Sequence, residues 1–280
     1  MSLIEVDELV VEYATRDRTV RALDGATLRV EPGERLAVVG ESGSGKSTLG
    51  AALGALLPAP ARIAEGSVTV HGQTLAELDR DGLRALRRET LGFIPQDPIA
   101  TLDPTKRIGK QLALVVGDLG GDTSRGALAN LLEDVRINDP ASVLRRFPHQ
   151  LSGGMAQRVA VAIAMVRKPS VLVADEPTAA LDANVRRDVL RLIFDIAAET
   201  GATVIWLSHD LDAVAKWCER VVVMYRGKVV EDGPAGVVLQ EPEHPYTKSL
   251  LDSMPSRLQH GVEVRTYTEM LRMQDEEEAV

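Results

Sequence analysis

One short stretch of the chain has the residue spacing of a phosphate-binding loop (P-loop). Residues 40–47 read Gly-Glu-Ser-Gly-Ser-Gly-Lys-Ser and fit the pattern G-x-x-x-x-G-K-[ST]. In such a loop the glycines let backbone N–H groups turn towards phosphate oxygens, Lys46 reaches the β- and γ-phosphates, and Ser47 offers a hydroxyl to Mg²⁺. A Gly- and Ser-rich turn that fits by chance is the alternative, but a predicted strand before the loop and a predicted helix after it favour nucleotide binding. The predicted binding residues are Gly40, Ser42, Gly43, Ser44, Gly45, Lys46, Ser47 and Thr48.

Two carboxylates follow an apolar segment later in the chain. Val171 to Ala174 are apolar, and Asp175 and Glu176 come directly after them. Ligands of parallel sheets bind at the carboxyl ends of the strands, so these acids are predicted to face the nucleotide. Asp175 is the predicted holder of Mg²⁺ through water, and Glu176 the predicted base that deprotonates the attacking water, a role worth about 10²–10⁴ in rate. Two acids that only cap a strand end are the alternative.

A second phosphate-facing helix start is predicted at Ser152, Gly153 and Gly154. Serine is a favourable N-cap, and the glycines leave the first N–H groups of the helix open to an anion. Taken alone, this sequence is more typical of a simple helix cap. Its interpretation as an anion site depends on its order among the other motifs.

The elements that position these residues follow the rhythm of an α/β protein. The pattern predicts a strand at Arg35 to Val39 before the P-loop and a helix over Ser47 to Leu57 after it. Further along, it predicts a strand at Val171 to Ala174, a helix over Val185 to Glu199 and a strand at Thr203 to Leu207. Strands that alternate with helices indicate a parallel core.

Other segments alternate apolar and polar residues between turn signals. Ile4 to Tyr13, Thr19 to Val30 and Ser67 to Val70 are predicted to form an antiparallel layer. Val221 to Tyr225 and Lys228 to Glu231 flank a turn and predict a hairpin. The chain is therefore expected to combine an antiparallel β subdomain with the parallel core.

Changes of pattern predict the domain boundaries. Residues of about 97–155 read as helices without a strand, which predicts a helical subdomain inserted into a domain spanning residues 1–235. A C-terminal extension is expected over residues 236–280, and it ends in an acidic tail, Asp275-Glu-Glu-Glu278. The last ten residues are expected to be loose.

The composition excludes several classes of protein. In 280 residues, 45% are hydrophobic, which excludes a disordered chain. Because 41 acidic residues outnumber 32 basic ones, nucleic acid is an unexpected partner. Cys218 is the single cysteine, so neither an intramolecular disulfide nor a cluster held by several thiolates is possible, and a reducing compartment is expected. No signal peptide is predicted, because the N-terminus is acidic and lacks a continuous apolar region. No membrane span is predicted either, since the longest apolar run, Val159 to Val166, is too short.

The order of the motifs resembles the nucleotide-binding subunit of ATP-binding cassette (ABC) transporters over nearly the whole chain. The motifs are the P-loop, Gln96, Leu151-Ser-Gly-Gly154, Asp175-Glu176, Ala180-Leu-Asp182 and His209. The resemblance implies an α/β fold, namely a P-loop ABC-type nucleotide-binding domain with an antiparallel β subdomain and a helical subdomain. It also implies ATP and Mg²⁺ as cofactors.

The resemblance further implies roles for single residues. Tyr13 matches the aromatic on which adenine stacks, although an ordinary strand-end tyrosine is the alternative. Gln96 matches the glutamine that senses Mg²⁺ and the membrane partner. Asp182 lies in the segment that meets the dimer seam. His209 matches the histidine that holds both the γ-phosphate and Glu176, the residue that orients the water.

A head-to-tail dimer with two sandwiched ATP molecules is also implied. Ser152, Gly153 and Gly154 of one subunit would complete the P-loop site of the other. Since Lys46, Asp175, Glu176 and His209 are all present, the chain is expected to be catalytically competent. Its partner is either a paralogous ATPase or a second copy.

Four separated segments resemble the importers of dipeptides, oligopeptides and nickel: the P-loop, Pro95–Pro104, Leu151–Met155 and Pro242–Leu251. The implied function is an ATP-hydrolysing subunit that powers import of peptides or related small solutes. It would lie in the cytoplasm on the inner face of the membrane, docked on transmembrane permease subunits through Gln96 to Gln111. An extracytoplasmic solute-binding protein would act with it indirectly.

Two departures and two alternatives accompany this resemblance. Ala156 stands where the group commonly has a basic residue, and the extra cysteines of some longer members are missing. A nickel or metal-opine importer is one alternative function. A non-transport ABC ATPase acting on nucleic acid is the other, but the chain has neither long heptad repeats nor a second cassette.

Overall fold

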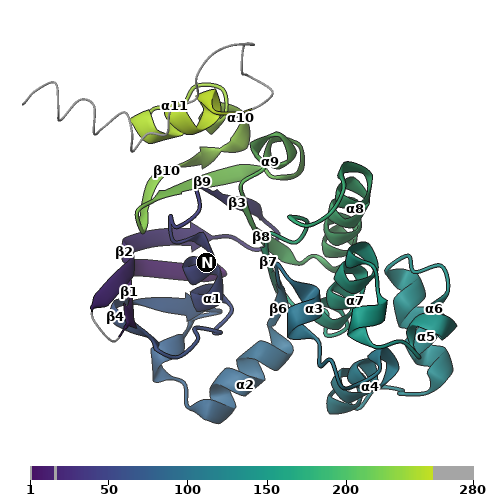
Figure 1. Cartoon of the computed structure of the whole chain (residues 1–280). Helices are drawn as coiled ribbons and strands as arrows, with labels where there is room; N and C mark the ends of the chain where they lie inside the picture. Colours follow the sequence, from purple (N-terminus) through teal and green to yellow (C-terminus); the bar gives the residue numbers. More distant parts are fainter. Residues whose placement is uncertain (1, 16–17, 255–280) are drawn as a thin grey trace, which may run out of the picture. The chain divides into compact units, whose positions relative to one another are not determined.

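The computed structural model of the chain describes residues 2–15 and 18–254 (Figure 1). The acidic tail and the last ten residues discussed above lie outside the described residues. The chain divides into two compact units. Unit 1 takes the described residues of Met1–Ala52, Leu56–Ala76 and Leu207–Val280, and unit 2 takes Leu53–Ala55 and Glu77–Trp206.

An antiparallel sheet in unit 1 confirms the predicted antiparallel layer. Its strand order is β2-β1-β4-β5, with bounds β1 (Ile4–Ala14), β2 (Thr19–Val30), β4 (Ala61–Val70) and β5 (Gln73–Thr74). Burial alternates at the start of β1, where Ile4 and Val6 are buried and Glu5 and Asp7 are exposed. This period of two is what a sheet with one covered face requires.

The remaining strands of unit 1 lead into the P-loop. Strand β3 (Arg35–Val39) is parallel to β9 (Arg220–Tyr225), and β10 (Lys228–Pro234) is antiparallel to β9. The predicted hairpin is thereby confirmed. Residues 36–39 and 221–224 are all buried, which explains why both strands read as continuous apolar runs.

Four helices complete unit 1: α1 (Lys46–Leu53), α9 (Leu211–Trp217), α10 (Ala235–Val238) and α11 (Pro245–Asp252). Helix α1 ends before the predicted Leu57. Ala55 adopts a left-handed conformation with φ of 53°, and the Leu56 N–H closes the end of the helix on the Ala51 carbonyl. Such a left-handed residue stops a helix.

Unit 2 is mainly helical around a pair of parallel strands, β6 (Leu91–Ile94) and β7 (Val171–Asp175). Its helices are α2 (Arg80–Glu89), α3 (Pro98–Thr101), α4 (Ile108–Asp118), α5 (Arg125–Asp134), α6 (Pro140–Val143), α7 (Gly153–Met165) and α8 (Ala183–Thr200), with a short 3₁₀ turn η2 (Pro148–Gln150). Another 3₁₀ turn, η1 (Leu75–Glu77), carries the chain from unit 1 into unit 2. Strand β8 (Thr203–Ser208) carries the chain from unit 2 into unit 1.

The segment 97–155, all of which is described, contains helices and no strand, as predicted. Helix α7 lies at the centre of this region and contacts α3, α4, α5 and α8, which surround it in Figure 1. Its Val159 and Val161 are fully buried. Helix α2 and strand β6 were not predicted. Within the described residues, none of the helices combines the length and the apolar character needed to cross a lipid bilayer.

Candidate nucleotide-binding site

The P-loop connects β3 to α1 and passes very close to neighbouring backbone. Gly40 and Gly45 have φ of 150° and 105°, a region that side chains disfavour. A Cβ atom at Gly40 would lie 2.3 Å from the Met224 carbonyl oxygen, and one at Gly45 would lie 2.7 Å from the Ala22 carbonyl oxygen. Only glycine fits at these two positions, so the tight loop follows directly from the motif.

Lys46 is buried and folds back over the loop. Its Nζ donates hydrogen bonds to the carbonyl oxygens of Gly40 at 2.7 Å and Glu41 at 2.9 Å. A buried ammonium is costly unless it is hydrogen-bonded, and these carbonyls stabilise it. The arrangement keeps a positive charge directly above the loop, at the place where a phosphate-binding lysine is needed.

The first turn of α1 carries the other predicted side chains of the loop. Ser47 is exposed there, and Thr48 is half-buried. The Tyr13 hydroxyl lies 3.4 Å from Thr48 Oγ1, which brings β1 to the start of this helix. The structure therefore brings Tyr13, the predicted adenine platform, together with the P-loop.

The turn between β9 and β10 also contacts the P-loop. The Gly227 N–H donates to the Ser44 carbonyl oxygen at 2.8 Å, and the Gly227 carbonyl oxygen accepts from the Asp24 N–H at 3.0 Å. Sequence reasoning identified this turn as a hairpin but missed its contact with the P-loop. No local pattern indicates a contact between residues this far apart in the chain.

Unit 2 brings two other predicted residues together. Gln96 Nε2 donates a hydrogen bond to Glu176 Oε2 at 3.4 Å. Glu176 is half-buried and has φ of 41°, an uncommon conformation for glutamate, and Asp175 is half-buried at the end of β7. Backbone strain of this kind is concentrated at functional sites, where it re-aims a side chain.

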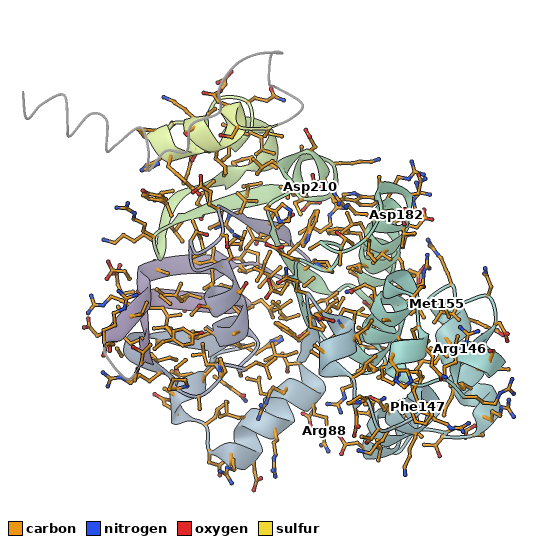
Figure 2. The ribbon with its side chains drawn as sticks, in the orientation of Figure 1. Arg88, Arg146, Phe147, Met155, Asp182 and Asp210 are labelled. Carbon is orange, nitrogen blue, oxygen red and sulfur yellow. The ribbon has the colours of Figure 1, made fainter. Side chains whose placement is uncertain are left out.

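The helix start at Ser152 has the predicted cap. Ser152 Oγ accepts the Met155 N–H at 3.3 Å, and Figure 2 labels Met155 in this first turn of α7. A Cβ atom at Gly154 would lie 2.7 Å from Val185 Cγ1, so this glycine also allows α7 to approach α8 closely. Ser152 and Gly153 are exposed.

Asp182 and His209 lie next to helix starts. Asp182, labelled in Figure 2, caps α8 through Oδ1, which accepts the N–H groups of Asn184 and Val185 at 3.1 Å each. His209 is exposed after β8 and precedes Asp210, the cap of α9, which is also labelled in Figure 2. Asp182 therefore has a structural role as a cap in addition to its predicted role at the dimer seam.

Cys218 is buried after α9, and burial raises the pKa of its thiol to about 12. A buried free thiol of this kind packs as a small hydrophobic group. Within the described residues, no group of three or more His, Cys, Asp or Glu side chains is arranged to hold a metal ion.

Comparisons with known proteins cover most of the chain. A family model described as "ABC transporter" matches residues 23–179. A probable peptide ABC transporter ATP-binding protein of Sinorhizobium fredii is 39% identical over 91% of this chain and 77% of its own length. The oligopeptide transport ATP-binding protein OppD of Bacillus subtilis is 38% identical over 94% and 75%, respectively. The dipeptide transport ATP-binding protein DppD of Escherichia coli is 38% identical over 91% and 79%.

Solved structures give the same answer for the fold. The dimeric ATP-binding cassette MJ0796 bound to ADP and Pi superposes with a TM-score of 0.73 at 28% identity, over 83% of this chain and 98% of that one. The cassette cbiO1 of Clostridium perfringens superposes with a TM-score of 0.68 at 28% identity, over 86% and 96%. The predicted α/β cassette fold, with an antiparallel sheet and helices, is therefore confirmed.

Proposed function

The chain belongs to the ABC transporter family and is an ATPase of that family, and from this premise we propose that it powers the import of peptides or related small solutes. The observation that carries the proposal is the P-loop with its buried Lys46, in a chain whose relatives named above are peptide transport subunits. The relatives' names support peptide import over nickel import and over an ATPase that acts on nucleic acid.

The nucleotide is proposed to sit with its phosphates on the P-loop, held by its backbone N–H groups, Lys46 and Ser47. Tyr13 would support the adenine, because its ring belongs to the strand that reaches the start of α1. Glycines at positions 40 and 45 let the loop pass close to the carbonyl oxygens of Met224 and Ala22. This assignment uses only residues of unit 1.

Mg²⁺ is proposed as the accompanying ion. The candidate ligands are the Ser47 hydroxyl, the Gln96 amide oxygen and the Asp175 carboxylate. Hard oxygen donors of this kind fit Mg²⁺, which binds few protein groups and keeps several waters. When bound, the ion would neutralise charge on the β- and γ-phosphates. Ser47 and Gln96 are exposed and Asp175 is half-buried.

Hydrolysis is proposed to depend on Glu176 and His209. Glu176 would accept the proton of the attacking water, and its hydrogen bond from Gln96 would hold the carboxylate in one orientation. His209, which is exposed, would hold the γ-phosphate. Ser152, Gly153, Gly154 and Asp182 would act across a head-to-tail dimer with a second ATPase or a second copy of the chain.

The partners in the membrane are proposed to be permease subunits, with a solute-binding protein acting on the outer side. The docking segment is proposed to be Gln96 to Gln111, at the inner face of the membrane. Pro98 of α3 and Leu102 just after it are buried, whereas Ile99 is 39% exposed, so Ile99 is an apolar side chain available for docking. For the domain organisation, we propose that residues 1–235 form the ATPase domain, with a helical subdomain at about 97–155. Residues 236–280 would form the C-terminal extension.

The test combines uptake with hydrolysis. Cells that lack the chain are supplied with the wild type or with Lys46→Ala, and uptake of a radiolabelled peptide is measured beside the Mg²⁺-dependent ATPase activity of the purified proteins. We expect Lys46→Ala to lose both, because the cation that meets the phosphates is removed. A well-folded Lys46→Ala protein with wild-type activity would contradict the P-loop assignment. If cells that lack the chain take up the peptide as fast as cells that have it, the proposal of peptide import is contradicted.

A further inference from the structure

The C-terminal segment Pro242–Asp252 returns to the P-loop, more than 200 residues away in the sequence. The Glu41 N–H donates a hydrogen bond to the hydroxyl oxygen of Tyr246 at 2.8 Å. Tyr246 lies in the first turn of α11 and is fully buried. A side chain from outside the nucleotide-binding motifs is thereby bonded directly to the loop.

Several contacts fix the position of Tyr246. The Glu231 carboxylate of β10 accepts the N–H groups of Glu243 at 2.8 Å and His244 at 3.1 Å. His244 Nδ1 in turn accepts the Tyr246 N–H at 3.1 Å, which caps α11. The ring of Tyr246 packs on the ring of Tyr225 with centroids 4.3 Å apart and an interplanar angle of 33°. The hydroxyl therefore comes from an anchored segment, and its position is set in advance.

The backbone of Glu41 is held at both its N–H and its carbonyl oxygen. Its N–H donates to Tyr246, while its carbonyl oxygen accepts from Lys46 Nζ at 2.9 Å and from the Ser44 N–H at 3.2 Å. Lys46 is the residue proposed to meet the phosphates, so the carbonyl oxygen of Glu41 is bonded to the proposed phosphate-binding residue. The N–H of Glu41 is bonded to Tyr246, which gives the loop a fixed support.

The chemistry of the phenol suits this support. Burial raises the pKa of Tyr246 to about 12, and the Glu41 N–H opposes the rise only in part. The phenol is therefore neutral at physiological pH, and its oxygen accepts the N–H while it keeps its own proton. Removal of the oxygen would leave a backbone N–H without this acceptor, which costs more than the net value of an ordinary hydrogen bond.

We propose that Tyr246 is a positioning residue of the nucleotide site: its hydroxyl holds the P-loop in the conformation that receives the phosphates. The C-terminal extension is then part of the ATP-binding machinery and does more than cover the core. The inference rests on the proposed function, because it needs the P-loop to bind ATP. It adds a residue that lies in none of the motifs that contact the nucleotide.

The test compares Tyr246→Phe with Thr247→Val in the full-length chain. Tyr246→Phe keeps the ring on Tyr225 and removes only the oxygen. Thr247 is the matched control, because its Oγ1 is buried and has no hydrogen-bond partner within the described part of the chain. The dissociation constant of a fluorescent N-methylanthraniloyl ATP is measured with Mg²⁺, together with melting temperatures with and without ATP. Wild type and Lys46→Ala are measured in parallel.

We expect Tyr246→Phe to weaken ATP binding by about five- to tenfold, the value of one hydrogen bond, and to reduce the gain in melting temperature that ATP gives. Thr247→Val should bind ATP as the wild type does. Glu231→Ala, which removes the anchor of the segment without touching the loop, should also weaken binding. Glu231→Ala still tests the positioning role of Tyr246 if Tyr246→Phe does not fold.

The other outcomes separate the two proposals. If Lys46→Ala loses binding but Tyr246→Phe and Glu231→Ala bind as the wild type does, only the role of Tyr246 is overturned. If Tyr246→Phe lowers the melting temperature equally with and without ATP at an unchanged dissociation constant, its role is structural and the inference is wrong. If Lys46→Ala binds as tightly as the wild type, the P-loop site and the inference both fail.

Discussion

Gln96 donates a hydrogen bond to Glu176 across 3.4 Å because the two residues occupy equivalent positions just after the ends of two neighbouring parallel strands. Ile94 of β6 pairs with Ala174 of β7, and Gln96 and Glu176 each follow two residues later. The carboxyl ends of parallel strands meet at one edge of the sheet, so the register itself brings the amide to the carboxylate. The proposed sensor of Mg²⁺ and the proposed base are therefore in direct contact.

The first prediction concerns this contact. Gln96→Ala should weaken ATP binding far less than Lys46→Ala does and lower kcat by about ten- to a hundredfold, because the Glu176 carboxylate loses the donor that orients it. Steady-state ATPase assays and equilibrium binding measure the two effects separately. Gln73→Ala, which removes an exposed amide from β5, is the control and should change neither. A Gln96→Ala protein with wild-type kcat would show that the hydrogen bond has no part in hydrolysis.

The second prediction concerns the helix start at Ser152. Alanine favours helices over glycine by about 1 kcal/mol, but a Cβ at Gly154 would lie 2.7 Å from Val185 Cγ1 on a stiff, branched side chain. We expect Gly154→Ala to lower the free energy of unfolding by about 1–3 kcal/mol. In a Val185→Ala background the same change should be neutral or stabilising. Urea denaturation of the single and double variants measures this coupling.

Gly126 provides the matched control for Gly154. Both are the second residue of a helix that a serine caps, Ser124 for α5 and Ser152 for α7. A Cβ at Gly126 would meet nothing within 4 Å. Gly126→Ala should therefore be neutral or slightly stabilising. Equal destabilisation by both glycine substitutions would mean that contact with Val185 is not the cause.

The sequence predicted most of the elements that carry the site, because their signals are local. Strand β3 has the predicted bounds, Arg35 to Val39, since a buried strand reads as an apolar run and the glycines of the P-loop mark its end. The pairing of Gln96 with Glu176 was not predicted, because strand β6 is only four residues long and gives no period. Helix α2 was missed because its sequence, RDGLRALRRE, has few apolar residues.

The contact of Tyr246 with Glu41 could not be derived from any local pattern. The segment Pro242–Leu251 was noticed only through its resemblance to a family signature, and a resemblance does not say what a residue touches. The contact depends on the tertiary course of β9 and β10, which carries the extension back beside the P-loop. Contacts of this kind require the folded structure.

The third prediction concerns Cys218 and pH. Burial raises the pKa of the thiol to about 12, whereas a thiol in the unfolded chain titrates at about 8.5. The native thiol therefore keeps its proton at a pH where the thiol of the unfolded chain has lost it, and ionisation favours the unfolded chain. The contribution of the thiol to the free energy of unfolding is fully present below about pH 8.5 and is lost as pH rises towards 12. At pH 8 we expect Ellman's reagent to react with native Cys218 at least about a hundredfold more slowly than with the denatured chain.

The control for Cys218 is an exposed thiol in the same protein. Gln73→Cys in a Cys218→Ala background replaces an exposed side chain and should react at the rate of a free thiol. Rapid reaction of native Cys218 would contradict its burial. The same measurement reports whether any variant described above has loosened unit 1, in which Cys218 lies.

The last prediction tests base and dimer together. Glu176→Gln should bind ATP, lose most hydrolysis and accumulate an ATP-bound dimer with itself or with a second ATPase, because the substitution keeps the shape of the side chain but removes the base. Size-exclusion chromatography with and without ATP measures the dimer. Hydrolysis at the wild-type rate would mean that Glu176 is not the base.

Adding Ser152→Arg to the Glu176→Gln variant should prevent the accumulation of the ATP-bound dimer. The bulky side chain would occupy the space where this helix start meets the γ-phosphate bound by the opposing subunit. Ser124→Arg is the matched control. Ser124 and Ser152 are both exposed, and each Oγ accepts a backbone N–H at 3.3 Å as a helix cap. Both substitutions remove a helix cap at a cost of about 1 kcal/mol, but only Ser152 is proposed to complete the nucleotide site of the opposing subunit. A dimer lost with Ser152→Arg and retained with Ser124→Arg would therefore report the site itself. Loss with both would report helix stability alone, and retention with both would remove Ser152 from the dimer seam.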